Sequence, residues 1–142
     1  NARVFTEDGF FLTGDVMRRH SDGRYVVEGR KKDLINRGGE KISAEEVENM
    51  LLAHPAVRNA ACVPMPDPVL GERTCVYVIA APGTPPTLDE LGAFLLDQGL
   101  AKFKLPERLE LVERFPLSPF GKVSKKDLAE TIAAKLAEEQ RE

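Results

Sequence analysis

One stretch of the sequence joins a glycine pair to the start of a helix: Ile35-Asn36-Arg37-Gly38-Gly39-Glu40-Lys41-Ile42-Ser43-Ala44-Glu45-Glu46-Val47-Glu48-Asn49. The adjacent glycines tolerate left-handed backbone angles that other residues avoid. Ser43 stands three residues before Glu46, which is a capping-box arrangement, and apolar residues recur at helical spacing at positions 47, 50 and 51. We therefore expect a polar, glycine-rich segment over 30–41, followed by a helix of about three turns that ends near His54-Pro55.

The flanking segments have the composition of strands. Residues 10–30 predict a β-hairpin, because Asp22-Gly23 supplies the positive φ angles that a tight turn needs. Two strands are expected over 57–63 and 74–81, with an irregular loop at 64–68 whose prolines exclude a regular ladder. A half-buried strand is expected over 108–112, where apolar and polar residues alternate.

Two more helices are expected in the second half of the chain. Thr87 and Glu90 form another capping box, and Gly99 stands where a left-handed residue would end that helix. The last helix starts at Ser124 and carries apolar residues every four positions, at 128, 132 and 136, before it frays into charged residues. The order of elements predicts an α+β fold, with a small antiparallel or mixed sheet flanked by about three helices and preceded by an N-terminal β-hairpin.

The composition excludes several classes of function. A net charge of −3 over 142 residues argues against a general binder of nucleic acid or of anionic membranes. No apolar run approaches the length of a membrane span, and the N-terminus has no export signal. Cys62 and Cys75 lie in apolar runs and are expected to be buried free thiols, which fits a cytoplasmic location.

Three segments combine glycine with charge: residues 13–15, 29–42 and 116–123. The window 30–41 has five basic and two acidic residues, which suits an anionic ligand such as a phosphate, although a solvated basic turn is the alternative. In the third segment Gly121-Lys122 ends a proline-rich loop. It is not a Walker A loop, because Val123 occupies the place of the required Ser/Thr. By itself this loop is more typical of a surface turn before a helix.

In this order and spacing, the three segments resemble the last core motifs of the adenylate-forming superfamily of acyl-CoA synthetases, peptide-synthetase adenylation domains and luciferases. Thr13-Gly14-Asp15 resembles the Thr-Gly-Asp motif, residues 29–32 the Gly-Arg-x-(Asp or Lys) hinge motif, and residues 116–122 the Pro-x-x-x-x-Gly-Lys motif. The resemblance covers essentially the whole chain. Residues 35–57 look most like the aryl-acid branch, the 2,3-dihydroxybenzoate-AMP and salicylate-AMP ligases of siderophore biosynthesis.

The resemblance implies a role for several residues in adenylation, the reaction of a carboxylic acid with Mg-ATP to form an acyl-adenylate. Asp15 would bind the ribose hydroxyls, and Arg30 would contact the ribose or phosphate side of the nucleotide. Lys122 would be the catalytic residue, with its ammonium between the substrate carboxylate and the α-phosphate. Lys32 falls on the hinge about which the domain would rotate. No residue is expected to be a metal ligand.

The second half-reaction, transfer of the acyl group to a pantetheine thiol, is implied for the same domain after rotation. Gly38, Gly39 and Lys41 would then line the pantetheine tunnel. A carrier protein would dock on this domain, and a basic patch of Lys102, Lys104 and Arg108 is a candidate surface for an acidic partner helix. The alternative for that patch is a solvated basic face.

The resemblance also implies a division of the chain. Residues 1–31 would be the tail of a large N-terminal adenylation domain, and residues 32–142 the mobile C-terminal lid. The phosphate loop and acyl pocket of the large domain are absent from this sequence, so the chain alone is expected to be inactive. Two alternatives remain: the lid of an acyl-CoA synthetase that uses free CoA, and a non-catalytic module that binds pantetheine or a carrier protein.

Overall fold

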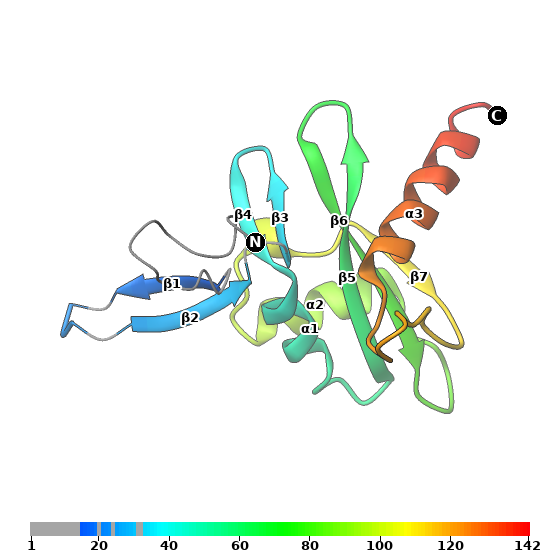
Figure 1. Ribbon diagram of the computed structural model, residues 1–142. Coiled ribbons are helices and arrows are strands. Elements are labelled where there is room, and N and C mark those ends of the chain that lie inside the picture. The colour runs from blue at the N-terminus through cyan, green and yellow to red at the C-terminus, as the bar shows by residue number, and fades with distance from the viewer. Residues whose placement is uncertain (1–14, 20, 24, 31–32) are drawn as a thin grey trace.

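The computed structural model describes residues 15–19, 21–23, 25–30 and 33–142. Figure 1 shows a two-stranded hairpin that projects to one side and a larger sheet that carries the helices. No helix in this described part is long and apolar enough to cross a membrane. The elements are β1 (Asp15–Arg19), β2 (Tyr25–Arg30), β3 (Leu34–Arg37), β4 (Glu40–Ser43), α1 (Ala44–Leu51), β5 (Val57–Asp67), β6 (Gly71–Ala80), α2 (Leu88–Asp97), the 3-10 helix η2 (Lys102–Lys104), β7 (Arg108–Leu111) and α3 (Lys125–Glu139).

The expected N-terminal hairpin is present as β1 and β2, which pair antiparallel. Gly23 lies in the connection between them with φ +89°, so the predicted turn at Asp22-Gly23 is confirmed. The part of the prediction that falls on residues 10–14 lies outside the described residues.

The glycine-rich segment is a second hairpin, which the sequence analysis did not predict. β3 and β4 pair antiparallel with Ile35 opposite Ile42, and Gly38-Gly39 forms the two-residue turn between them with φ +58° and +94°. Positive φ at both central residues is the requirement of a type I′ turn. Both isoleucines are 0% exposed, so the hairpin is anchored in the core although its tip is polar.

The larger sheet is built around β6. It has the strand order β4-β3-β6-β5, and β7 also pairs with β6. β5 runs along one edge of β6, so β3 and β7 share the other edge. β7 is parallel to β6 and the other pairings are antiparallel, so the predicted α+β fold with a mixed sheet is confirmed.

The prediction of an irregular loop over 64–68 is wrong for residues 64–67, because β5 continues through Pro64 and Pro66 and only Pro68 lies in the turn. Pro64 pairs with Thr74 and Pro66 with Glu72. β5 lies at the edge of the sheet, so only one of its sides is paired with another strand. The backbone nitrogens of residues two apart, such as Pro64 and Pro66, point to the same side of a strand. Both prolines therefore face the open side of the strand, where no ladder hydrogen bond is lost.

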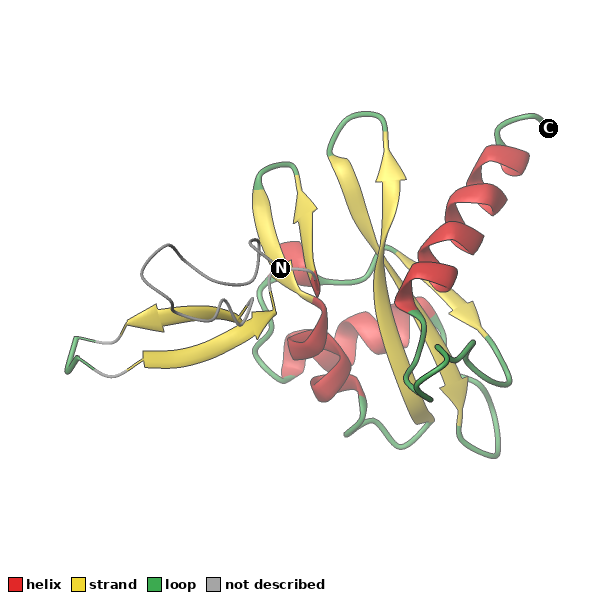
Figure 2. Ribbon diagram, viewed as in Figure 1, coloured by secondary structure: helices red, strands yellow, loops and turns green. Residues whose placement is uncertain are grey.

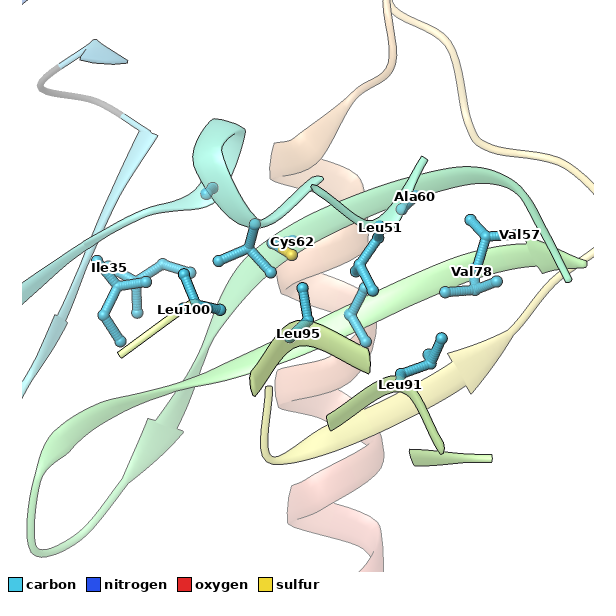
Figure 3. Packing of buried hydrophobic residues seen from close by; sticks show 13 residues of the cluster. Ile35, Leu51, Val57, Ala60, Cys62, Val78, Leu91, Leu95 and Leu100 are labelled. Atoms are coloured by element: carbon cyan, nitrogen blue, oxygen red, sulfur yellow. The ribbon is translucent and has the colours of Figure 1, made fainter. Parts of the chain in front are cut away.

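The sheet separates two apolar cores, because neighbouring residues on a strand point to opposite faces. Figure 2, in the view of Figure 1, shows α1 and α2 on one side of the long β5–β6 pair and α3 on the other. Figure 3 shows the first core, which α1 and α2 close: Ile35, Ile42, Ala44, Val47, Leu51, Val57, Ala60, Cys62, Val76, Val78, Leu91, Leu95 and Leu100. The second core lies under α3 and contains Ala61, Val63, Met65, Cys75, Tyr77, Phe115, Leu128 and Ile132.

The helix caps follow the sequence closely. Thr87 and Glu90 make both hydrogen bonds of the predicted capping box, and Gly99 follows the C-terminus of α2 with φ +93°. Ser124 caps α3 by accepting from the N–H of Asp127. α1 is shorter than the expected three turns, because the chain tightens after Leu51 into turns ahead of Pro55, and the residue before a proline is disfavoured in a helix.

The two cysteines are buried free thiols, as predicted, and they lie in different cores. Burial raises the pKa of the Cys62 thiol, and it raises the pKa of Cys75 to about 12.

The thiolate is the reactive form of cysteine, so alkylation of Cys62 and Cys75 at pH 8 is expected to be about a thousandfold slower in the folded state than in the unfolded state. Peptide-resolved mass spectrometry after iodoacetamide treatment measures this, and rapid labelling of either peptide under native conditions would contradict it.

Candidate functional site

The loop that carries Lys122 is a rigid turn between two short extended segments. Leu117 and Val123 form an isolated antiparallel bridge. Inside this bridge, the N–H of Gly121 donates to the carbonyl of Ser118 at 2.9 Å, and the N–H of Ser118 donates to the carbonyl of Lys122 at 2.7 Å. Gly121 has φ +77°. This is a β-turn followed by a left-handed glycine, a common way to close a three-residue hairpin loop.

The sequence explains why the turn is well defined. Pro119 occupies the second position of the β-turn, where its fixed φ is already correct. The Ser118 hydroxyl accepts a further hydrogen bond from the N–H of Lys122 at 3.3 Å. Phe120 is 90% exposed at the tip, and the Lys122 side chain is also exposed. The backbone of Lys122 is therefore held by hydrogen bonds while its side chain is exposed.

The Lys122 side chain borders a groove of about 600 Å³ between the start of β3, the middle of β5 and the start of α3. Within the described part of the chain, Lys122 makes no ion pair. The groove is basic at this end. Its lining residues are Asp33, Leu34, Cys62, Pro64, Lys122, Val123, Lys125, Lys126 and Ala129.

Lys125, at the start of α3, is held by an ion pair with Glu48 of α1. Both side chains are partly buried, and burial raises the pKa of Glu48 although the hydrogen bond from Lys125 opposes this. The pair neutralises Lys125 and ties α3 to the opposite face of the sheet. Lys122 and Lys126 are left as the cations of the groove without a carboxylate partner among the described residues.

The two residues predicted to bind the nucleotide are brought together by the backbone. Asp15 begins β1 and Arg30 ends β2, and the two are directly opposite in the hairpin. Thr13, Gly14 and the predicted hinge Lys32 lie outside the described residues. Asp33, which follows Lys32, lines the groove beside Lys122, so the segment that begins β3 starts at the groove.

The predicted pantetheine residues lie at the far end of β3. Gly38 and Gly39 are exposed at the tip of the β3–β4 hairpin, and Lys41 is exposed on β4. The N–H of Gly38 donates to the carbonyl of Leu70 at 2.9 Å, which joins this tip to the β5–β6 tip. Figure 1 shows these two tips at one end of the molecule and the loop before α3 toward the other, so the Gly38-Gly39 turn and Lys122 occupy different ends.

The basic patch predicted for carrier docking is less positive than the sequence suggests. Lys104 pairs with Glu46 at 3.2 Å, and Arg108 makes two hydrogen bonds to Glu139 at 2.6 and 2.9 Å. The Glu139 hydrogen bonds raise the pKa of Arg108. Lys102 is exposed and makes no ion pair within the described residues. Docking on this patch remains a prediction.

Sequence reasoning missed the charged residues that support these loops. Glu48 and Lys125 are 77 positions apart, and Arg37 pairs with Glu107 across 70 positions. No local pattern relates residues at such separations, because the fold alone brings them together. Among the described residues, no group of three or more His, Cys, Asp or Glu side chains is placed to hold a metal ion.

Known proteins are similar to this chain both in sequence and in structure. The family model described as AMP-binding enzyme C-terminal domain matches residues 46–122. The chain is 60% identical over 136 residues to 2,3-dihydroxybenzoate-AMP ligase of Bacillus subtilis (strain 168), which covers 96% of this chain and 25% of that protein. It is 52% identical over 135 residues to salicylyl-CoA synthase / salicylate adenylyltransferase of a Streptomyces species, with coverages of 95% and 24%.

The fold is also similar to that of solved enzymes. The crystal structure of ATP-bound MatB from Rhodopseudomonas palustris superposes with a TM-score of 0.78 at 33% identity, covering 92% of this chain and 26% of that one. The chain thus spans about a quarter of the length of the proteins it matches. With more than half of its residues matched by the family model, the chain belongs to the AMP-binding enzyme C-terminal domain family.

Proposed function

We propose that this chain is the mobile C-terminal lid of an ATP-dependent ligase that adenylates an aryl acid and transfers it to a pantetheine thiol. The observation that carries the proposal is the Lys122 turn, whose exposed ammonium has no ion-pair partner among the described residues and lies on a hydrogen-bonded loop beside a basic groove. Residues 1–31 would belong to a large N-terminal adenylation domain and residues 32–142 to the lid. That large domain would supply the sites for ATP and acid.

Adenylation joins two anions, because the carboxylate attacks the α-phosphate of ATP and pyrophosphate leaves. Negative charge gathers on the phosphate and carboxylate oxygens in the transition state. Lys122 would place its ammonium between them, and a preorganised donor of this kind is worth about 3–4 kcal/mol. A free ammonium on a long stem suits the task, since a partner carboxylate would have to be displaced first.

Asp15 and Arg30 would meet the nucleotide from the β1–β2 hairpin, where they are opposite each other. A carboxylate can accept two hydrogen bonds from the ribose hydroxyls, and a guanidinium can donate to ribose or phosphate oxygens. Mg²⁺ would arrive with the ATP phosphates, and no residue of this chain is assigned to it.

The second half-reaction would use the other end of the domain. Rotation about Lys32 would withdraw Lys122 and bring Gly38, Gly39 and Lys41 to the active site, where the turn would line a tunnel for the pantetheine arm. The absence of side chains at the turn allows the backbone to approach a narrow ligand closely.

The acid and the acceptor are inferred from the relatives. The similarity to a 2,3-dihydroxybenzoate-AMP ligase favours 2,3-dihydroxybenzoate or salicylate as the acid, with an aryl carrier protein as acceptor in siderophore biosynthesis and a cytoplasmic location. The similarity to a salicylyl-CoA synthase supports the alternative, transfer to free CoA.

Acid-dependent exchange of pyrophosphate into ATP tests the proposal in the complete ligase. With 2,3-dihydroxybenzoate, salicylate, benzoate, octanoate and phenylalanine as substrates, we expect exchange with the hydroxybenzoates to exceed that with the last two by at least about a hundredfold. Thioester formation is then compared between a phosphopantetheinylated aryl carrier protein and CoA. Preference for octanoate or phenylalanine would overturn the choice of aryl acid, and no exchange with any acid would overturn the adenylation function.

A further inference from the structure

Glu107, which precedes β7, holds two arginines at the base of the β3–β4 hairpin. One carboxylate oxygen contacts Nε of Arg37, and the other lies 3.0 Å from Nε of Arg73. Arg37 is the last residue of β3, immediately before the Gly38-Gly39 turn. The N–H of Glu107 donates to the carbonyl of Thr74 in β6 at 2.9 Å, so the sheet fixes the backbone from which the carboxylate extends.

The same turn is supported from its other side by the β5–β6 hairpin. Asp67 accepts from the N–H groups of Val69 and Leu70 at 3.0 and 2.8 Å, which rigidifies that turn and holds the pKa of Asp67 below its usual range. Leu70 in turn accepts from the N–H of Gly38 at 2.9 Å, and its side chain fills the space where a Cβ at Gly38 would lie.

Arg73 connects the two supports. Its guanidinium lies 3.0 Å from Glu107 and 3.6 Å from Asp67. The two hairpin tips are thereby linked through two carboxylates and two arginines, with Glu107 contacting both cations. A Gly-Gly turn is otherwise the most conformationally free pair of residues that the chain can place at an exposed tip.

We propose that Glu107 is a positioning residue for acyl transfer, which fixes the Gly38-Gly39 turn through Arg37 and Arg73 in the geometry that receives the pantetheine arm. This inference rests on the proposed role of the turn in thioester formation. Glu107 does not touch the reactants; it acts by restricting the turn. Partly exposed ion pairs contribute little to overall stability, so loss of Glu107 should affect the placement of the turn more than folding.

The test compares Glu107→Gln with Glu110→Gln in the complete ligase. Glu110, three residues further on in β7, is also partly buried between two cations, Arg108 at 3.4 Å and Lys135 at 2.7 Å, but it contacts neither hairpin tip. Two rates are measured on each preparation: pyrophosphate exchange, and single-turnover transfer from preformed acyl-adenylate to pantetheine over a range of concentrations.

For Glu107→Gln we expect the transfer rate at saturating pantetheine to fall about tenfold, since misplacement by a fraction of an ångström is costly, while exchange stays within about twofold. Glu110→Gln should leave both rates within about twofold. Equal losses in both half-reactions, no loss of transfer, or the same loss in Glu110→Gln would overturn the positioning role.

A third variant, Gly39→Val, separates this inference from the proposed function. Selective loss of transfer in Gly39→Val without such a loss in Glu107→Gln would refute the positioning role and leave the function of the turn intact. Unchanged transfer in Gly39→Val would refute the function of the turn itself, and the positioning role with it.

Discussion

Replacing Lys122 by alanine in the complete ligase is expected to lower the rate of acyl-adenylate formation by about a hundredfold to a thousandfold, the usual loss for a single preorganised charge donor. The ammonium is exposed and makes no ion pair with the described residues, and its backbone is fixed by the turn from Ser118 to Gly121. The substitution removes the charge without disturbing the turn, since its hydrogen bonds come from backbone groups and the Ser118 hydroxyl. Pyrophosphate exchange measures the loss.

The expected loss is confined to one half-reaction. Transfer of the acyl group from preformed adenylate to the thiol should stay within about twofold in Lys122→Ala, because the lysine would leave the active site before transfer. Lys126→Ala is the matched control, since Lys126 lines the same groove and is also exposed. A similar loss in Lys126→Ala would attribute the effect to the overall charge of the groove, and equal loss of both half-reactions would contradict a domain that alternates between two conformations.

Local signals in the sequence were enough to place most of the elements. The capping residues Thr87 and Ser124 predicted the starts of α2 and α3, and both side chains accept the expected backbone hydrogen bonds. Leu128 and Ile132 were expected on the apolar face of the last helix, and both are buried against the sheet. These signals act within one or two turns of chain, so a sequence read locally contains all of the information they need.

The strands that were not predicted from the sequence depend on tertiary contacts. Pro64 and Pro66 looked incompatible with a ladder, and they are compatible because β5 has a neighbouring strand on one side only. The polar composition of residues 36–41 hid a hairpin whose burial depends on Ile35 and Ile42. Neither the position of a strand within its sheet nor the depth of one buried pair can be read from local composition.

In the candidate site, too, some features can be predicted from the local sequence and others depend on the fold. Gly121-Lys122 and Gly38-Gly39 stand out in the sequence because glycine next to charge is unusual in packed elements, and the structure places both at exposed turns. Their supports, Lys125 with Glu48 and Glu107 with Arg37, are invisible to any spacing rule. The residues that would act can be proposed from motifs, whereas the residues that hold them require the fold.

Replacing Gly39 by valine is expected to slow acyl transfer to the thiol by about a hundredfold, with adenylation kept within about threefold. Gly39 has φ +94°, which a β-branched residue adopts only with strain of about 1–3 kcal/mol, so the turn must change its shape. Apart from the two adjacent residues, no atom of the described residues lies within 4 Å of a Cβ built at this position, so the valine would project into space that the pantetheine arm is proposed to use. Single-turnover transfer from preformed adenylate measures the effect.

Gly83→Val controls for the strain. Gly83, in the connection between β6 and α2, has φ +117°, and an added Cβ would likewise meet no described residue within 4 Å other than its two chain neighbours. The two substitutions should therefore lower the free energy of unfolding by similar amounts. Since Gly83 lies on neither hairpin tip, Gly83→Val should retain transfer. If both variants lose transfer in proportion to their loss of stability, strain explains the defect and the turn has no special role. If Gly39→Val alone loses transfer at equal stability, the defect lies in the space beside the turn, which is where the thiol would have to pass.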